Sequence, residues 1–197
     1  KTYLDIGCAR GGTLKLLKDS CTDKDLELWG IEYFKEAFEE AKKIGSENKV
    51  FLGSGEENLN NLPDGYFDVI LCLDVLEHMP YPENFLKEIK LKLKDNGVLI
   101  SSLPSVRYFI HLFNLIFRKD WKYIDAGILD YTHFRFFTSK SILRMYNGLG
   151  YIVMDHFGIN PFRWKWFSLI IDILTLAFFR DTKYVQFLTI LKKKNHD

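Results

Sequence analysis

A short loop near the start of the chain contains the residues best suited to hold a small charged ligand. It reads Asp5-Ile6-Gly7-Cys8-Ala9-Arg10-Gly11, and it follows an apolar run and precedes a helical pattern. Glycines at such a turn permit positive φ and let a ligand approach the main chain. In an open α/β sheet, ligands bind at the carboxyl ends of the strands. The loop therefore predicts a ligand site at a strand-to-helix turn.

Two cofactors compete for this loop. A dinucleotide motif G-x-G-x-x-G would use Gly7 and Gly12, but Ala9 stands at its middle position, where the pyrophosphate approaches the backbone. Asp5 would repel a pyrophosphate, yet it suits a cofactor with an ammonium and a sulfonium group. The charges favour S-adenosylmethionine over NAD. Glu32, at the end of the next strand pattern, could accept ribose hydroxyls from either cofactor.

The elements that must position these residues alternate between strand and helix patterns. Apolar strand patterns end near residues 7, 32, 52, 73 and 100, and helical patterns cover 11–19, 35–45 and 83–94. Such alternation predicts right-handed βαβ units and a mainly parallel sheet. A helix over 138–149, capped by Thr138 or Ser139, and strands at 151–154 and 185–191 follow, the last one antiparallel. The expected fold is an α/β Rossmann-like three-layer sandwich.

Composition narrows the class of protein. The formal net charge of +1 provides no clustered basic face, so no nucleic-acid partner is expected. Cys8, Cys21 and Cys72 lack metal-ligand spacing, and no metal is expected; their odd number favours a reducing, cytoplasmic setting. The sequence opens directly in its first strand pattern, and we therefore expect an N-terminal segment to precede it.

Several segments together resemble class I S-adenosylmethionine-dependent methyltransferases, and most closely the ubiquinone-biosynthesis-like group. They are residues 5–11, 30–32, 62–70, 74–80 and 97–104. The resemblance spans about residues 2–157 and implies one methyltransferase domain over residues 1–197. It further implies transfer of a methyl group from S-adenosylmethionine to an oxygen of a small molecule, a saccharide or a lipid-linked glycan. The alternatives are a non-catalytic Rossmann-like interaction domain and an NAD-linked oxidoreductase.

The resemblance also implies roles for individual residues at the cofactor. The loop glycines and Ala9 would pack against the methionine part, Glu32 would hold the ribose, and Tyr33 would lie along the adenine. Family members carry an Asp after the third strand, whereas Ser54 stands there in this chain, with Glu56 or backbone groups as the alternatives. The cofactor-binding candidates are Asp5, Gly7, Cys8, Ala9, Gly11, Glu32, Tyr33, Ser54, Gly55, Glu56, Leu73 and Asp74.

Three polar side chains are candidates for the acceptor side of the site. His78 is the candidate general base, because an imidazole titrates near neutrality and an oxygen acceptor benefits from a base. The alternative is that Glu77 and His78 only shape their loop. His133 and Arg135 could meet the acceptor, and Arg135 would suit a carboxylate or phosphate. The alternative for these two is a packed lid.

Two aromatic-rich insertions, residues 105–137 and 158–182, are expected to form lid helices. Their apolar stretches are 108–117 and 162–179. Both are shorter than the roughly 20 apolar residues that span a bilayer. They would therefore pack on the sheet, form a homodimer, or make a peripheral contact at the inner membrane surface.

Overall fold

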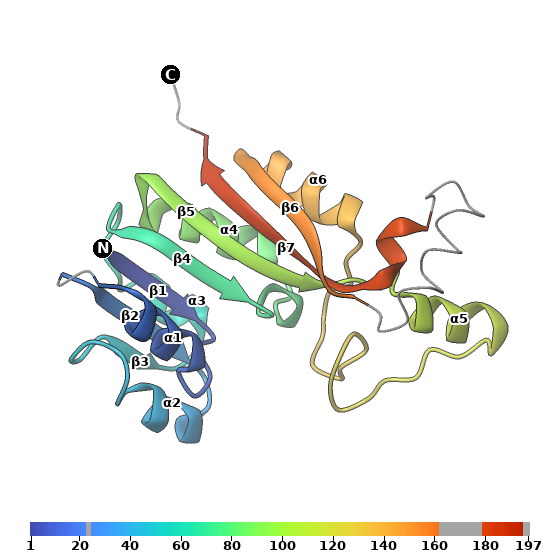
Figure 1. Cartoon of the computed structure of the whole chain (residues 1–197), viewed down its shortest axis with the longest axis horizontal. Helices are drawn as coiled ribbons and strands as arrows, with labels where there is room; N and C mark the ends of the chain where they lie inside the picture. The colour runs from blue at the N-terminus through green and yellow to red at the C-terminus, as the bar shows by residue number, and fades with distance from the viewer. Residues whose placement is uncertain (23–24, 162–178, 195–197) are drawn as a thin grey trace.

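The computed structural model describes residues 1–22, 25–161 and 179–194. In this part of the chain seven strands form one sheet with the order β3-β2-β1-β4-β5-β7-β6 (Figure 1). The strands are β1 (Thr2–Ile6), β2 (Glu27–Glu32), β3 (Val50–Leu52), β4 (Phe67–Leu73), β5 (Leu93–Pro104), β6 (Tyr151–Pro161) and β7 (Tyr184–Lys193). The helices are α1 (Gly12–Ser20), α2 (Lys35–Ala41), α3 (Gly55–Leu59), α4 (Pro82–Lys92), α5 (Phe109–Phe117) and α6 (Ser139–Gly148), with 3₁₀ turns η1 (Leu76–His78) and η2 (Arg180–Lys183).

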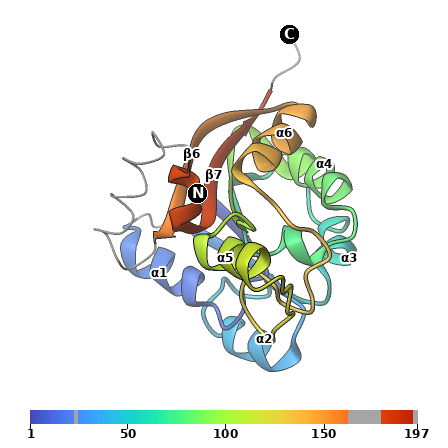
Figure 2. The ribbon, with the colours of Figure 1, turned by 90° about the vertical axis from the view of Figure 1, so that its right-hand side faces the viewer.

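All strands of the sheet run in the same direction except β7, the last strand in the sequence. β1 to β5 pair in parallel, whereas β7 lies antiparallel between β5 and β6. Helices on both faces complete three layers (Figure 2). The prediction of a Rossmann-like sandwich with an antiparallel last strand is confirmed.

Two apolar clusters fill the space between the sheet and its helices. Side chains of α3, α4 and α6 pack on one face, where Leu4, Ile70 and Leu99 of the sheet are fully buried. On the other face Leu14 of α1 and Ala41 of α2 pack in a smaller cluster that includes Cys8. Most residues of β1, β2 and β4 are buried, which agrees with their mainly apolar sequences.

The observed elements differ from the predicted ones mainly at their ends. β6 continues to Pro161. The first four residues of the predicted insertion 158–182 therefore belong to this strand. In the other insertion only α5 is helical, and the residues from 118 to 137 form loops. Thr138 is the cap of α6, with a reciprocal bond to Ser141. The predicted helix over 162–179 lies, except for its last residue, outside the described residues.

The strand order reverses between β1 and β4. β2 and β3 extend from one side of β1, and β4, β5 and β7 follow on the other. This reversal is the point where an open α/β sheet binds ligands beyond its carboxyl ends. It brings together the loops after β1, β2 and β4. No helix in the described part of the chain is both long enough and apolar enough to cross a membrane.

Candidate active site

The loop after β1 adopts left-handed backbone conformations at alternate residues. Gly7, Ala9 and Gly11 have φ values of 71°, 46° and 78°. The amides of Gly7 and Cys8 both donate to the carbonyl of Ile31 in β2, at 2.8 and 3.1 Å. A positive φ is costly for alanine, and such strain concentrates where backbone meets ligand. The predicted ligand loop, residues 5–11, is therefore a constrained turn tied to the neighbouring strand.

Glu32 holds this loop against the end of β2. Its side chain is buried, and its two oxygens accept the amides of Ala9 and Phe34, each at 2.8 Å. A carboxylate offers about four lone-pair positions, so two remain for other donors. Tyr33, the residue predicted to lie along the adenine, follows directly and is exposed, with its ring edge-on to that of Phe34.

Asp5 lies buried beneath the loop. Its Oδ2 has no hydrogen-bond partner among the described residues. Burial, together with the nearby carboxylate of Glu32, raises the pKa of Asp5 to about 7. Burial beside the same two acids raises the pKa of the Cys8 thiol to about 12. Cys8 packs its side chain in the core, so only its backbone can face a cofactor.

The residues after β3 have evident structural roles. Ser54 caps α3 by accepting the amide of Glu57. A Cβ on Gly55 would lie 2.9 Å from the ring of Phe85, so the helix packs closely on α4 there. Glu56 is in the exposed first turn of α3. The cofactor roles predicted for Ser54, Gly55 and Glu56 stay predictions.

The segment after β4 touches the loop after β1. A Cβ on Gly7 would lie only 2.8 Å from the side chain of Val75. Leu73 ends β4 and is half-buried, and Asp74 has a left-handed backbone with φ 55°. The Asp74 carboxylate accepts bonds from Ser102 of β5 and Gln186 of β7, at 2.9 and 2.8 Å. This carboxylate therefore links the loop after β4 to two further strands.

A cavity of about 240 Å³, which we call the histidine cavity, opens beside this segment. Its walls come from the loop after β4, the ends of β5 and β7, and the loop before α6. The lining residues are Asp74, Glu77, His78, Pro104, Gly127, Ile128, Asp130, His133, Val185 and Gln186. Two residues predicted from the sequence to face the acceptor, His78 and His133, thus line one cavity, and their ring centroids lie 4.7 Å apart.

Glu77 is the residue of this cavity whose role the sequence did not reveal. It is 1% exposed, and its Oε2 has no partner among the described residues. Burial, with smaller contributions from Asp74 and Asp130, raises its pKa to about 8. An acidic residue directly before the candidate histidine was the available signal.

Arg135 lies elsewhere. Its guanidinium donates to the carbonyl of Pro80 at 2.8 and 2.6 Å, and its amide donates to the carbonyl of Glu77. It is not among the lining residues of the histidine cavity. Arg135 thus ties the loop before α6 to the loop after β4, and its predicted contact with the acceptor stays a prediction.

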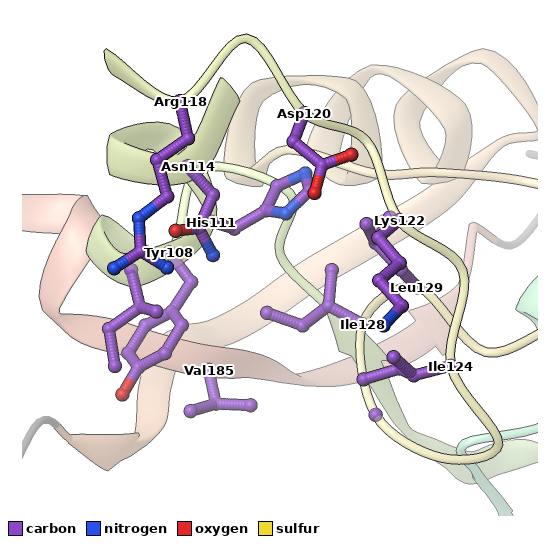
Figure 3. Close-up of a pocket in the computed structure, with 12 residues that line it drawn as sticks. Tyr108, His111, Asn114, Arg118, Asp120, Lys122, Ile124, Ile128, Leu129 and Val185 are labelled. Carbon is purple, nitrogen blue, oxygen red and sulfur yellow. The ribbon is translucent and has the colours of Figure 1, made fainter. Parts of the chain in front are cut away.

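A second cavity of about 450 Å³, the α5 cavity, adjoins the first (Figure 3). The two share Gly127, Ile128 and Val185 as lining residues. Figure 3 shows Arg118 and Asn114 on the side of α5, and Lys122 on the opposite side beside the apolar residues Ile124, Ile128 and Leu129. The two cavities therefore lie side by side between the loop after β4 and α5.

Known proteins are similar to this chain in sequence. A family model described as "Methyltransferase domain" matches residues 1–156. A ubiquinone biosynthesis O-methyltransferase of Aeromonas salmonicida is 29% identical over 165 residues, covering 81% of this chain and 66% of that protein. The mitochondrial enzyme of the same name from Schizosaccharomyces pombe is 28% identical over 174 residues, covering 84% and 61%. The chain spans less than two thirds of the length of these relatives.

Solved structures share the fold at lower sequence identity. A SAM-dependent methyltransferase from Archaeoglobus fulgidus superposes with a TM-score of 0.74 at 18% identity, covering 98% of this chain and 86% of that one. An S-adenosylmethionine-dependent methyltransferase from Mesorhizobium loti gives 0.63 at 12% identity, covering 98% and 90%.

The sheet order and the loop after β1 define a class I methyltransferase, whose cofactor is S-adenosylmethionine. The chain belongs to the methyltransferase-domain family, which its first 156 residues match. The residues present fit the cofactor: a buried carboxyl without a partner lies under the loop, and a second carboxylate with spare lone pairs lies beside it. Such groups suit a ligand that carries positive charge and hydroxyls.

Proposed function

We propose that the protein transfers the methyl group of S-adenosylmethionine to a hydroxyl oxygen of a small-molecule acceptor. The observation that carries the proposal is the close packing of Gly7 on Val75, because it sets the cofactor loop beside the segment that leads into the histidine cavity. The bound cofactor supplies an electrophilic methyl group on a sulfonium. The protein must orient the acceptor toward it, which can contribute several kcal/mol.

The cofactor would be held at the ends of β1 and β2. In this proposal Glu32 keeps its bonds to Ala9 and Phe34 and accepts the ribose hydroxyls with its remaining lone pairs. The backbone of Gly7, Ala9 and Gly11 meets the methionine part, and Asp5 contributes negative charge beneath it. Leu73 and Asp74 border the cofactor on the side of the acceptor.

The acceptor would occupy the two neighbouring cavities. Its reactive hydroxyl would lie against His78 and His133 in the histidine cavity, and its body would lie in the α5 cavity. The apolar wall suits an apolar or aromatic body, while Arg118 and Lys122 could bind an acidic substituent (Figure 3). The curated relatives are named as O-methyltransferases of ubiquinone biosynthesis. Their names support a small-molecule acceptor with an apolar or aromatic body.

Calorimetric titration tests the cofactor site. We expect S-adenosylmethionine and S-adenosylhomocysteine to bind and NAD to give no signal. Glu32→Gln should weaken both adenosyl ligands about 100-fold, since two charge-assisted hydrogen bonds are lost or reversed. Glu36→Gln, in the exposed first turn of α2, is the matched control and should leave binding unchanged.

The same titration separates this proposal from its rivals. Binding of NAD with no binding of the adenosyl ligands would favour the oxidoreductase. Binding of none of the three would favour an interaction domain.

The exposed face of α5 gives a further prediction. Ile116 and Phe117 are 62% and 71% exposed, and the basic pair Arg118 and Lys119 follows them. We propose that this face makes a peripheral contact with the inner membrane surface, which would place the protein in the cytoplasm at the membrane.

Vesicle sedimentation tests the contact. Ile116→Ser combined with Phe117→Ser should reduce co-sedimentation with vesicles that contain anionic lipid, without lowering the unfolding temperature. A loss of dimer in analytical ultracentrifugation with unchanged vesicle binding would show instead that α5 pairs with a second copy.

A further inference from the structure

We infer that Asp130 and Thr132 are positioning residues, which hold the imidazole of His78 in the form that accepts a proton from the acceptor. The inference rests on the proposed function and concerns the base of that reaction. Nδ1 of His78 lies 2.9 Å from Oγ1 of Thr132, and the same hydroxyl lies 2.6 Å from Oδ1 of Asp130. The three residues come from the turn after β4 and from the loop before α6, which lie 54 positions apart in the sequence.

These hydrogen bonds fix which ring nitrogen of His78 carries the proton. The carboxylate of Asp130 is ionised at neutral pH, because its hydrogen bonds with Thr132 lower its pKa below the ordinary value. An ionised carboxylate only accepts, so the hydroxyl of Thr132 donates its single proton to Asp130. The oxygen of that hydroxyl then accepts from Nδ1 of His78. Nε2 of the neutral ring therefore has the lone pair that can take up a proton.

His78 is placed to use this nitrogen on a ligand. Its side chain is exposed and lines the histidine cavity. The hydrogen bond that the described part of the chain makes to the ring uses Nδ1, which leaves Nε2 for the acceptor. A base must come within hydrogen-bond reach of the proton that it removes. An acceptor hydroxyl in this cavity meets that requirement at Nε2.

The charge of Asp130 favours the protonated ring. When Nε2 accepts a proton, the imidazole becomes a cation, while Nδ1 keeps its bond to Thr132. An opposite charge nearby favours the charged form of a group. Asp130 therefore stabilises the imidazolium that forms as the acceptor loses its proton. The carboxylate of a hydrolase triad orients and stabilises its histidine in the same way.

Two neighbouring titratable residues are less suited to be the base. Nδ1 of His133 lies 3.1 Å from the carbonyl oxygen of Ile128, so no carboxylate is linked to this ring. Burial lowers the pKa of His133, which disfavours its protonated form. Burial raises the pKa of Glu77 to about 8, so this carboxyl already carries a proton at neutral pH. Of the two histidines in the cavity, His78 is therefore the base.

The reaction step needs no further reactant. The acceptor hydroxyl gives its proton to Nε2 of His78 while its oxygen bonds to the methyl carbon. The carbon–sulfur bond breaks, its electron pair stays on sulfur, and S-adenosylhomocysteine remains. His78 then releases the proton to solvent, since its side chain is exposed.

Nitrogen-15 NMR of the full chain tests the position of the proton. Long-range ¹H–¹⁵N spectra at pH 8 distinguish a ring nitrogen that carries a proton from one that has a lone pair. We expect the wild type to carry the proton on Nδ1 of His78, whose signals are assigned by their loss in His78→Gln. Thr132→Val should let the form protonated on Nε2 appear, because the hydroxyl that holds Nδ1 is gone. Thr132→Ser keeps the hydroxyl and should keep the wild-type spectrum.

Methyl transfer tests what the positioning does. The probe is 4-hydroxybenzoate, which combines the hydroxyl, the aromatic body and the acidic group of the proposed acceptor. His78→Gln should lower kcat about 100-fold or more, since a positioned base contributes about 10²–10⁴-fold. Thr132→Val and Asp130→Asn should each lower kcat about 10-fold, as expected for partial loss of that contribution. Asp125→Asn, an exposed acid of the same loop, is the control, and all variants should bind S-adenosylmethionine as the wild type does.

The inference and the proposed function fail in different ways. A wild-type ring protonated on Nε2, or the same His78 spectrum in Thr132→Val and wild type, would overturn the inference. Equal kcat in Asp130→Asn and wild type would also overturn it. If S-adenosylmethionine did not bind, the proposed function would be wrong, whatever the spectra show. If the cofactor bound and the probe stayed unmethylated, the proposed class of acceptor would be wrong, and the spectra would decide the inference.

Discussion

Asp5→Asn should raise the free energy of unfolding of the ligand-free protein by up to about 4 kcal/mol at pH 8. The pKa of Asp5 is about 7 in the folded protein and 3.8 in its ordinary state, because the carboxyl is buried and lies near Glu32. A difference of about three pH units corresponds to about 4 kcal/mol. Below pH 3.8 the Asp5 carboxyl is protonated in the folded and in the unfolded protein, so it does not lower the free energy of unfolding. Its cost grows as the pH rises and is complete above pH 7.

Denaturant unfolding at pH 4 and pH 8 measures this effect. The difference in the free energy of unfolding between variant and wild type should be large at pH 8 and close to zero at pH 4. Asp19→Asn, on the exposed surface of α1, should show no comparable change. The same Asp5 variant should bind S-adenosylmethionine more weakly, since a positively charged ligand favours the ionised carboxyl. A variant as unstable at pH 8 as the wild type would contradict this account of Asp5.

Gly11→Ala should destabilise the protein by about 2–5 kcal/mol and abolish cofactor binding. Gly11 has φ 78° where α1 begins, and a Cβ there would lie 2.9 Å from Ile44 and 3.0 Å from the backbone of Ala41. A left-handed alanine costs about 1–2 kcal/mol, and crowding in a packed region adds about 1–3 kcal/mol. Relaxation would move the loop that meets the cofactor.

The neighbouring glycine provides the control. A Cβ on Gly12 would meet nothing within 4 Å, and Gly12 is the first residue of α1. Gly12→Ala should therefore change stability by less than about 1 kcal/mol, in the favourable direction, because alanine prefers the helix. Thermal unfolding and calorimetry on the pair test this contrast. Equal effects at the two positions would show that the conformation of Gly11 is not what matters.

The fold could be predicted from local patterns. Apolar runs that alternate with helical periods imply βαβ units, and handedness rules leave few ways to connect them. The alternation of residues 185–191 was enough to predict the antiparallel β7. The short helix α3 was missed because five residues give too little periodicity. Similarly, α4 ends at Lys92 and β5 begins at Leu93. The apolar pattern continues across this boundary, so the predicted helix over 83–94 extended two residues into the strand.

The proximity of the candidate cofactor residues could be predicted for the same reason. Asp5, the loop glycines and Glu32 lie at the ends of two adjacent parallel strands, so a local motif already implies their proximity. The sequence by itself therefore determined the class of fold and the proximity of these candidate residues.

The histidine cavity, where we propose that the acceptor binds, was decided by the tertiary structure. Glu77 and His133 meet only because the loop before α6 returns over the segment after β4, where the amides of Phe134 and Arg135 bind the carbonyl of Glu77. That return depends on hydrogen bonds between residues more than fifty positions apart, which no periodicity records. The same bonds direct Arg135 to Pro80 and away from the cavity. Burial then leaves Glu77 with an unpaired oxygen, and burial is a property of the packed chain alone.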